Sequence, residues 1–417
     1  MSSTPPPPLP PPPGWNPTPP YGNYAGYQYQ SPQAPPPPPW KRLNRFQQIL
    51  VGCGGCFGIL VLLALIGSAF SGPSKLAQST HHNPIAIQKT SRPRSTTPPT
   101  LVVGHPPVST GTPRWVISLS PNISTTQNND LQSVTCVSLS DCWSVGDYNG
   151  SSATQTLIEE WNGTSWSIVT SPNTSTTLSN DLFGVSCVSA TDCWAVGFTS
   201  FQTLIEHWNG TTWSIVTSPN TSTTEDNGLA GVNCVSATDC WAGGDYFTYN
   251  SGNYYYQTLI EHWNGTSWSI VTSPNTSTTQ NNYLNSVSCV SSDCWAVGYY
   301  WNSGNYYQTL IEEWNGMSWS IATSPNTSTT ENNVLADVNC VSSSECIAVG
   351  AHRHTGNKHQ TLIERWNGMS WSIATSPNTS TTEDNGLAGV SCVSATDCWA
   401  VGSTSSRTLI ERWNGSA

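Results

Sequence analysis

The chain has 417 residues, with 13 Lys and Arg against 24 Asp and Glu. All 24 acids lie in residues 114–417 together with only six basic residues, so that part has a formal charge of −18. Because nucleic-acid binding needs a basic surface, this charge argues against nucleic acid as a partner.

Residues 1–47 are dominated by proline, together with Tyr, Gln and Gly. A segment of this composition has too few apolar residues to form a core, which predicts a disordered tail with polyproline II character. We interpret it as a solvated spacer. The alternative is a docking ligand of the PxxP type.

An uncharged apolar stretch of 22 residues runs from Ile49 to Phe70. At about 1.5 Å per residue it is long enough to span a bilayer, so a transmembrane helix is predicted over residues 48–70. Lys41, Arg42 and Arg45 precede it, and the positive-inside rule then leaves the N-terminus in the cytoplasm. The long leader favours an uncleaved anchor over a signal peptide. We expect a single-pass protein of the cell membrane with an extracellular C-terminal domain.

Two features of this segment concern its packing. Gly54 and Gly58 have the spacing that lets two membrane helices approach closely, so a homodimer formed through the helix is one expectation. Cys53 and Cys56 have the spacing of a redox motif, but within a membrane helix we interpret them as small residues. Residues 71–113 are rich in Ser, Thr and Pro and are predicted to be a disordered linker.

From residue 114 the sequence repeats six times with a period of roughly 50 residues. Each unit holds four runs rich in Val, Ile, Thr and Trp, separated by turn residues, which predicts four antiparallel strands. The Asn-Gly pair between the third and fourth runs predicts a two-residue type I′ turn. Repeats of this length and strand content predict a β-propeller.

The two ends of the repeated region favour a closed ring. The sixth unit lacks a fourth strand, whereas residues 115–122 match a fourth strand in sequence and have no unit of their own. The starting segment would complete the last unit, and closure would remove the exposed edges of the ring. We therefore predict an all-β domain over residues 114–417, a six-bladed propeller of four-stranded blades closed by the N-terminal strand.

Two motifs recur: Cys-Val-Ser-x-x-Asp-Cys-Trp-Ala-Val-Gly and Leu-Ile-Glu-x-Trp-Asn-Gly-x-Ser-Trp. Over residues 115–417 the chain resembles bacterial membrane-anchored exported proteins with Kelch-like or BNR-like propeller repeats. The resemblance implies the propeller fold and transfers no activity. A sialidase-type Asp box would place Asp where the second unit has Trp208, and of the Kelch diglycines only Gly243-Gly244 is present.

Twelve cysteines lie in six local pairs, which predicts six disulfides, each joining the first two strands of a unit. The pairs are Cys136 with Cys142, Cys187 with Cys193, Cys234 with Cys240, Cys289 with Cys294, Cys340 with Cys346, and Cys392 with Cys398. The fourth pair is one residue closer than the others, so we expect a two-residue loop there and three-residue loops elsewhere. Zinc would need four ligands at one point. No cofactor is expected.

One glutamate recurs on the third strand of every unit, at Glu159, Glu206, Glu261, Glu312, Glu364 and Glu411. In the second unit it shares a strand face with Trp208 and Trp213, since side chains alternate along a strand. We interpret the tryptophans as core, and the glutamate as a buried carboxylate that accepts backbone N–H bonds.

Variation in length is confined to the connection between the second and third strands, which holds 8, 4, 12, 9, 9 and 4 residues in the six units. When the residues of this connection are subtracted, the distance from the first cysteine of one unit to that of the next is 43 residues, except in the fourth unit, where it is 42. The third and fourth connections are rich in Tyr, Asn, Ser and Gly, the composition of adaptable recognition loops. The predicted ligand-binding residues are Tyr246, Tyr249, Tyr254, Tyr255, Tyr256, Tyr299, Tyr300, Trp301, Tyr306 and Tyr307.

These patterns favour a non-enzymatic surface receptor that binds a glycan or an envelope protein through the variable connections. One alternative is a propeller-type glycoside hydrolase or lyase, which would need two unlike carboxylates in a cleft. Outside the repeated positions, the acids expected on the face with the variable connections are Asp147, Asp181, Glu225, Asp226, Asp245, Glu331, Asp337, Glu383 and Asp384. Another is a spacer without a ligand. The fifth connection holds His352, His354 and His359, which we interpret as basic surface rather than a metal site.

Overall fold

The computed structural model describes residues 118–250, 252–354, 358–405 and 407–415. The predicted tail, membrane helix and linker lie outside these residues, as do residues 115–117 of the predicted closing strand. The described residues contain no helix, and so none that is long and apolar enough to cross a membrane.

Six antiparallel sheets, here called blades 1 to 6, follow one another along the chain. Blade 1 has β1 (Asn129–Ser138), β2 (Asp141–Asn149), β3 (Thr154–Trp161) and β4 (Trp166–Val169), and blade 2 has β5 (Asn180–Ser189), β6 (Asp192–Thr199), β7 (Gln202–Trp208) and β8 (Trp213–Val216). Blade 3 has β9 (Asn227–Ser236), β10 (Asp239–Asn250), β11 (Asn253–Trp263) and β12 (Trp268–Val271), and blade 4 has β13 (Asn282–Val290), β14 (Asp293–Trp301), β15 (Tyr307–Trp314) and β16 (Trp319–Ala322). Blade 5 has β17 (Asn333–Ser342), β18 (Glu345–His354), β19 (Lys358–Trp366) and β20 (Trp371–Ala374), and blade 6 has β21 (Asn385–Ser394), β22 (Asp397–Thr404) and β23 (Arg407–Trp413).

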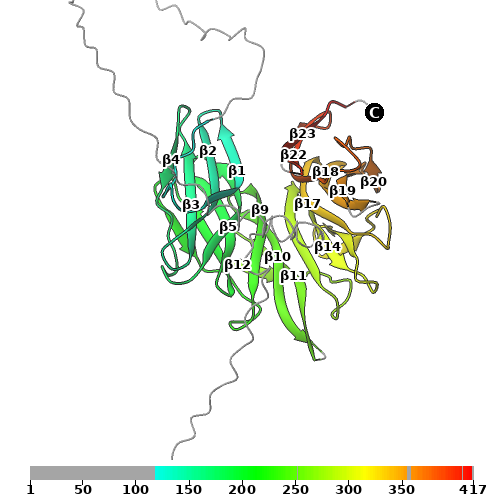
Figure 1. The fold of residues 1–417 in the computed structure, drawn as a ribbon. Coiled ribbons are helices and arrows are strands. Elements are labelled where there is room, and N and C mark those ends of the chain that lie inside the picture. The colour runs from blue at the N-terminus through cyan, green and yellow to red at the C-terminus, as the bar shows by residue number, and fades with distance from the viewer. Residues whose placement is uncertain (1–117, 251, 355–357, 406, 416–417) are drawn as a thin grey trace, which may run out of the picture. The chain divides into compact units, whose positions relative to one another are not determined.

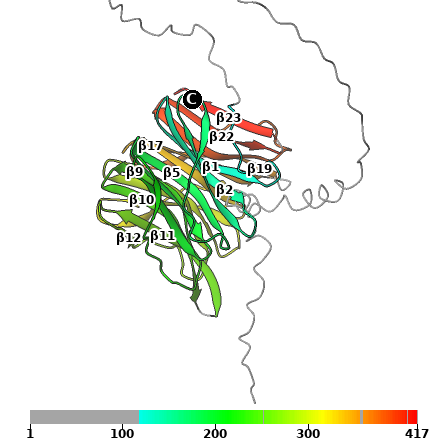
Figure 2. The same ribbon diagram turned by 90° about the vertical axis from the view of Figure 1, so that its left-hand side faces the viewer.

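Consecutive blades pack against each other through their first strands. β1 packs on β5, β5 on β9, and so on to β17 on β21. Figures 1 and 2 both show β1, β5 and β9 side by side. The first strands therefore lie nearest the common centre, as in a propeller. The prediction of six propeller blades is confirmed.

The same side chains fill every junction between consecutive blades. Between blades 1 and 2, Trp143, Val145 and Ile158 pack on Leu182 and Trp213. Trp and Val of the Cys-Trp-Ala-Val motif thus face the next blade, whereas Cys and Ala face the previous one. Because the middle strands are covered on both faces, their sequences are nearly continuous apolar runs.

The glycine that ends this motif is required by a close approach of two strands. A Cβ on Gly197 would overlap the carbonyl oxygen of Asp181 in β5. The register of β5 against β6 shifts between Leu182 and Gly184, a β-bulge that brings the backbones together there. The same overlap recurs at the matching glycine of every blade.

All six predicted disulfides are present, with Cα–Cα distances of 4.0–4.1 Å. The three-residue loops expected in five blades are wrong. In blade 1, Ser138 pairs with Asp141 after a register shift, so the loop has two residues and the extra residue forms a bulge. In blade 4, Val290 pairs with Asp293 without a shift, which gives the predicted two-residue loop.

The predicted two-residue type I′ turn at Asn-Gly is also wrong. Trp208 pairs with Trp213, so four residues connect β7 to β8. Gly210 has a φ of 89°, while Asn209 is not among the residues with positive φ. The Asn209 side-chain oxygen accepts bonds from the backbone N–H groups of Thr211 and Thr212, both at 3.0 Å. Asparagine here stabilises a wider turn with its side chain.

Blades 1 and 6 differ from the others on the faces that would meet in a closed ring. Val401 and Ile410 on blade 6 are 46% and 45% exposed, although the matching Val196 and Ile205 of blade 2 are fully buried. On blade 1, Val134 is 61% exposed, whereas Val185 in blade 2 is 7% exposed. Both open faces carry the apolar side chains of a blade junction.

Candidate ligand-binding site on the loop face

Two kinds of connection meet at one end of the blades, here called the loop face. They are the hairpin between the second and third strands and the link from the fourth strand to the next blade. In blade 4, Asn302 donates to the Thr329 carbonyl at 2.8 Å, and the Tyr307 amide donates to Asn332 at 3.0 Å. The opposite end, the turn face, carries the disulfide hairpins and the Asn-Gly turns.

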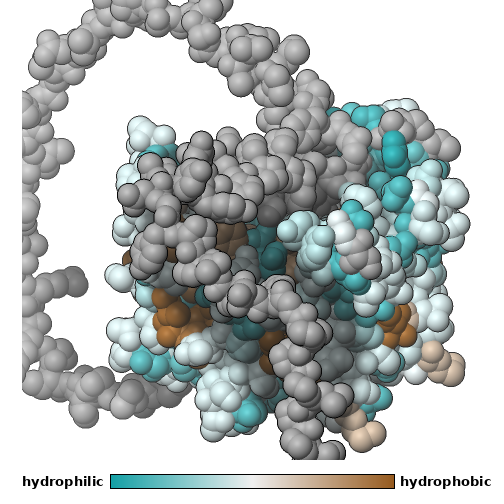
Figure 3. Space-filling view, turned by 90° about the horizontal axis from the view of Figure 1, so that it is seen from below, coloured by the Kyte–Doolittle hydropathy of each residue, from teal (hydrophilic) through white to brown (hydrophobic). Residues whose placement is uncertain are grey.

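The long third connection extends two strands rather than forming a loop. β10 runs to Asn250 and β11 starts at Asn253, with Phe247 opposite Tyr256 and Tyr249 opposite Tyr254. Tyr, Phe and Thr favour strands, which explains the extension. Figure 1 shows this hairpin, in green, reaching beyond its neighbours. Figure 3 views the molecule from the side to which the hairpin points, and the coloured surface there is mostly white to teal with small separate brown areas.

Aromatic side chains form a continuous row from this hairpin into blade 4. The row consists, in order of contact, of Tyr249, Tyr254, Phe247, Tyr256, Tyr283, Tyr299, Tyr307 and Trp301. Neighbouring ring centroids are 4.7–5.3 Å apart, within the range of favourable aromatic pairs. We call this set the aromatic row.

One end of the aromatic row is open to solvent and its middle is buried. Tyr249 and Tyr254 are 61% and 54% exposed. Burial, together with the neighbouring Tyr299 and Asp245, raises the pKa of Tyr283 well above its ordinary value. The buried rings hold the exposed pair in place, which lowers the entropy cost of binding a ligand there.

Six of the ten predicted binding residues lie in the aromatic row, and four do not. Tyr246 and Tyr300 pack on the cores of two blade junctions, and burial raises the pKa of Tyr246. Tyr255 points to the other face of the hairpin from Tyr254, because successive side chains of a strand alternate between the two faces. Tyr306 has no ring contact in the aromatic row.

Two members of the aromatic row were not predicted. Phe247 alternates with Tyr249 along β10 and therefore shares its face. Tyr283 is the aromatic residue at a first-strand position that holds Asp, Gly or Val in the other blades. That difference between repeats was visible in the sequence.

The recurring glutamates join the blades on their buried faces. Glu206 is fully buried and accepts a hydrogen bond of 3.0 Å from the hydroxyl of Ser171 in blade 1. Matching bonds join Ser120 to Glu159, Ser218 to Glu261, Ser273 to Glu312, Ser324 to Glu364, and Ser376 to Glu411. Burial of the glutamates is confirmed, but their hydrogen-bond donors are serine hydroxyls rather than the expected backbone N–H groups.

Burial dominates the electrostatics of these glutamates. It raises the pKa of Glu206, Glu261, Glu312 and Glu364 to about 8, against a smaller opposing effect of the serine bonds. These carboxyls are therefore mostly neutral at pH 7. They hold the blades together and do not face a cleft where chemistry would occur.

Two acids near the loop face of blades 1 and 2 also have raised pKa values. Burial, and then the charges of Asp181 and Asp130, raise the pKa of Asp147 to about 7. Burial raises the pKa of Asp181 to about 6. Carboxyls that titrate near neutral pH are able to exchange protons, and they would serve the alternative enzyme function. They lie in other blades than the aromatic row.

The three histidines of blade 5 do not converge on a metal site among the described residues, which omit 355–357. The backbone N–H of His359 donates to Asp384 at 3.0 Å, and its Nδ1 lies 3.2 Å from the same oxygen. The rings of His352 and His354 are 6.2 Å apart.

No protein-family model and no curated protein matches the chain. Among solved structures it is similar to YCF48 bound to D1 peptide, with 13% identity, a TM-score of 0.43, and coverage of 72% of this chain and 84% of that one. It is also similar to a PL25 polysaccharide lyase, an ulvan lyase, with 10% identity, a TM-score of 0.46 and coverage of 67% and 77%. A third similar structure is a neuraminidase-like protein from A/bat/Guatemala/164/2009, with 9% identity, a TM-score of 0.42, and coverage of 72% of this chain and 88% of that one. The propeller assignment rests on the strand order and blade contacts above.

Proposed function

We propose that this protein is a membrane-anchored extracellular binding module whose ligand contacts the exposed end of the aromatic row. The observation that carries the proposal is the run of packed rings that ends in Tyr249 and Tyr254. Tyrosine offers a rigid apolar face and a hydroxyl, and few rotamers are lost when it binds. A single exposed ring would be ordinary surface, but a supported pair is a preorganised contact.

The favoured ligand is a neutral glycan, with an envelope protein as the other ligand class. Aromatic faces stack on the apolar faces of sugar rings, and the neighbouring Asn and Ser residues can bond sugar hydroxyls. The acidic charge of residues 114–417 disfavours anionic ligands. Tyr249 lies opposite Tyr254 at the tip of the hairpin, so a ligand can reach both rings.

Replacing Tyr249 and Tyr254 together with Ala is expected to weaken glycan binding at least tenfold, because each truncation removes an aromatic contact worth about 1 kcal/mol or more. The measurement is a titration of the purified full chain with the tightest-binding glycan of a panel. Tyr255→Ala, on the opposite face of the same strand, is the matched control and should bind like the wild type.

Equal affinity in the double variant would contradict the proposal. Turnover of a polysaccharide that is lost in Asp147→Asn would instead support the enzyme alternative.

The anchor and orientation are part of the same proposal. The support is the apolar stretch over residues 48–70 with basic residues before it. Protease added to intact cells should cut within the linker and release a fragment that contains the propeller, while an N-terminal tag stays with the cells. A chain that is fully protected, or fully soluble in lysates, would contradict this orientation.

We also propose that the N-terminal strand closes the ring as the fourth strand of blade 6. The support is the hydrogen bonding of Ser120. In the other blades, the serine that donates to the next blade's glutamate also bonds a threonine of its own blade, as Ser171 bonds Thr156 at 2.6 Å. Ser120 makes the first of these bonds, to Glu159 of blade 1. Its own blade would be blade 6, where the matching Thr408 is exposed although Thr156 is buried.

Asn122 supports the same placement. In blades 1 to 5 the matching asparagine accepts the backbone N–H of the same threonine, as Asn173 accepts from Thr156 at 3.0 Å. The backbone N–H of Thr408 would find its acceptor in Asn122 once the ring is closed. Closure would also cover the side chains of Val401 and Ile410, which are exposed on the open face of blade 6 in this structure.

A further inference from the structure

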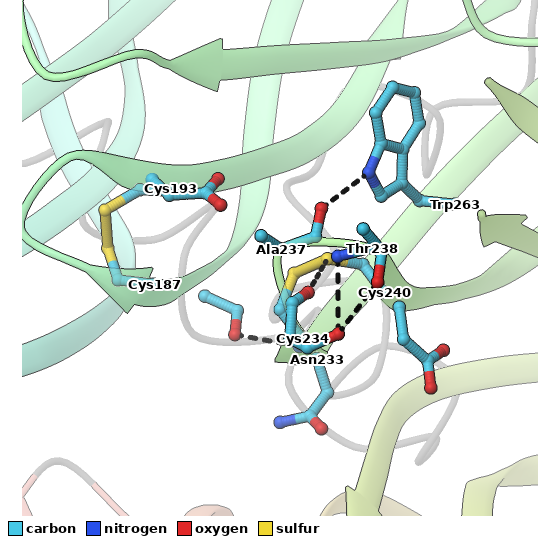
Figure 4. The surroundings of a disulfide bond; sticks show 12 residues. Cys187, Cys193, Asn233, Cys234, Ala237, Thr238, Cys240 and Trp263 are labelled. Carbon is cyan, nitrogen blue, oxygen red and sulfur yellow. Dashed lines mark hydrogen bonds between the residues drawn. A yellow bond between two sulfur atoms is a disulfide. The ribbon is translucent and has the colours of Figure 1, made fainter. Parts of the chain in front are cut away.

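One blade lacks a hydrogen bond that the other five share on the turn face. In these five, the tryptophan that ends the third strand donates its indole N–H to a carbonyl of the disulfide hairpin at 3.0–3.1 Å. Figure 4 shows the bond from Trp263 to Ala237. In blade 4, the indole N–H of Trp314 meets no acceptor among the described residues and is accessible to solvent.

The cause is the shortened hairpin of blade 4. Cys289 and Cys294 are one residue closer than the other pairs, the bulge is absent, and Ser291 takes a positive φ of 57°. In blade 3 a Cβ on Gly265 would touch the side chain of Thr238, whereas a Cβ on Gly316 of blade 4 would meet nothing within 4 Å. The shortened hairpin therefore leaves its Asn-Gly turn uncovered.

A pocket of about 530 Å³ opens at this place, between blades 3 and 4. It is lined by Trp241, Asp239 and His262 from blade 3, and by Trp314, Ser291 and Ser292 from blade 4, among others. Its size lies within the range of small-molecule sites. The pocket is on the turn face, at the other end of the blades from the aromatic row.

The lining determines which ligand fits. The ring of Trp314 packs 4.8 Å from that of Trp241, which is itself buried and stacked on His262, so the partly exposed Trp314 provides the apolar surface. Asp239 and His262 bond each other at 2.9 Å and remain 37% and 27% exposed. Serine and threonine hydroxyls, Asn264 and Gly316 complete the lining, which contains no Lys or Arg. The pocket thus suits a neutral ligand with hydroxyl groups and an apolar face.

The unpaired indole N–H adds a specific requirement. In the other blades its partner is an amide carbonyl, so a ligand amide carbonyl at the same position restores the missing bond. We infer that this pocket binds a single N-acetylated sugar residue. Its acetamido oxygen accepts from Trp314, and its hydroxyls face Asp239 and the two serines. This inference is independent of the ligand proposed for the aromatic row.

The test uses the full chain with its disulfides intact, titrated with N-acetylglucosamine and N-acetylgalactosamine by saturation-transfer NMR and tryptophan fluorescence. At least one of these sugars should bind saturably, and glucose at least tenfold more weakly. Inserting Ala between Ser291 and Ser292 restores the hairpin length of the other blades. It should weaken binding at least tenfold without lowering the unfolding temperature.

Two further variants separate this pocket from other sites. Deleting Ala237 shortens the hairpin of blade 3, and should open a second pocket beside Trp263, Asp192 and His207, so that two sugars bind per chain. Tyr255→Ala, which lies outside both the aromatic row and this pocket, should bind these sugars like the wild type. The inference is overturned if neither N-acetylated sugar binds, if the insertion leaves affinity unchanged, or if N-acetylalanine amide binds as tightly as the sugars.

Discussion

Trp115→Ala should lower the free energy of unfolding by about 3–5 kcal/mol, the usual cost of truncating a buried tryptophan. In the sequence repeat, Trp115 matches Trp213, Trp268, Trp319 and Trp371, which begin the fourth strands of blades 2 to 5 and are 5–6% exposed there. If the N-terminal strand completes blade 6, its tryptophan is buried in the same manner. Chemical denaturation followed by tryptophan fluorescence measures the difference.

Trp213→Ala is the matched reference, because its burial in the junction of blades 1 and 2 is established. The two variants should be destabilised by similar amounts. A loss below about 0.5 kcal/mol for Trp115→Ala, as for an ordinary surface position, beside a large loss for Trp213→Ala, would show that this strand does not close the ring.

The stability of the propeller should fall as the pH rises from about 5 to 8. The folded-state pKa of Glu206, Glu261, Glu312 and Glu364 is raised to about 8 from an ordinary value of 4.5. Within that window the unfolded chain has lost these protons while the folded chain retains them. Each carboxyl then contributes a slope of about 1.4 kcal/mol per pH unit. Its stabilising effect is complete below the unfolded pKa and is lost as the pH passes through the folded value.

Glu206→Gln isolates one of these carboxyls, because the amide keeps the shape and does not titrate. The variant should show a shallower fall in unfolding free energy between pH 5 and 8, by about the slope of one group. Denaturant titrations at several pH values measure it. An unchanged slope in the variant would mean that Glu206 is already ionised in the folded propeller at low pH.

The blade pattern and the disulfides were predictable because they depend on local sequence. Cys234 and Cys240 are joined within one hairpin, and the strand period places Trp241 and Ala242 on opposite faces. The turn at Asn209 was harder, since its width depends on bonds made by the side chain rather than on backbone preference. The bulge after Cys136 likewise depends on how one residue is accommodated in a strand pair.

The candidate sites depend on contacts between distant residues. Tyr254 and Tyr255 are equivalent in the sequence, and only the register of β10 against β11 shows which of them joins the aromatic row. The contact of Tyr256 with Tyr283 crosses a blade junction. The deletion in the fourth cysteine hairpin was visible in the sequence, but its effect on Trp314 required the geometry of the neighbouring turn.

Binding by a chain that lacks residues 247–254 tests the central claim most directly. This deletion shortens the hairpin of blade 3 to the length found in blade 2 and removes the exposed end of the aromatic row. Both proteins would be screened against the same set of glycans that contain no N-acetylated sugar, so that the pocket beside Trp314 does not contribute. The account predicts saturable binding by the wild type that is lost in the shortened chain while its disulfides and unfolding temperature are kept. Equal binding by the two proteins would contradict it.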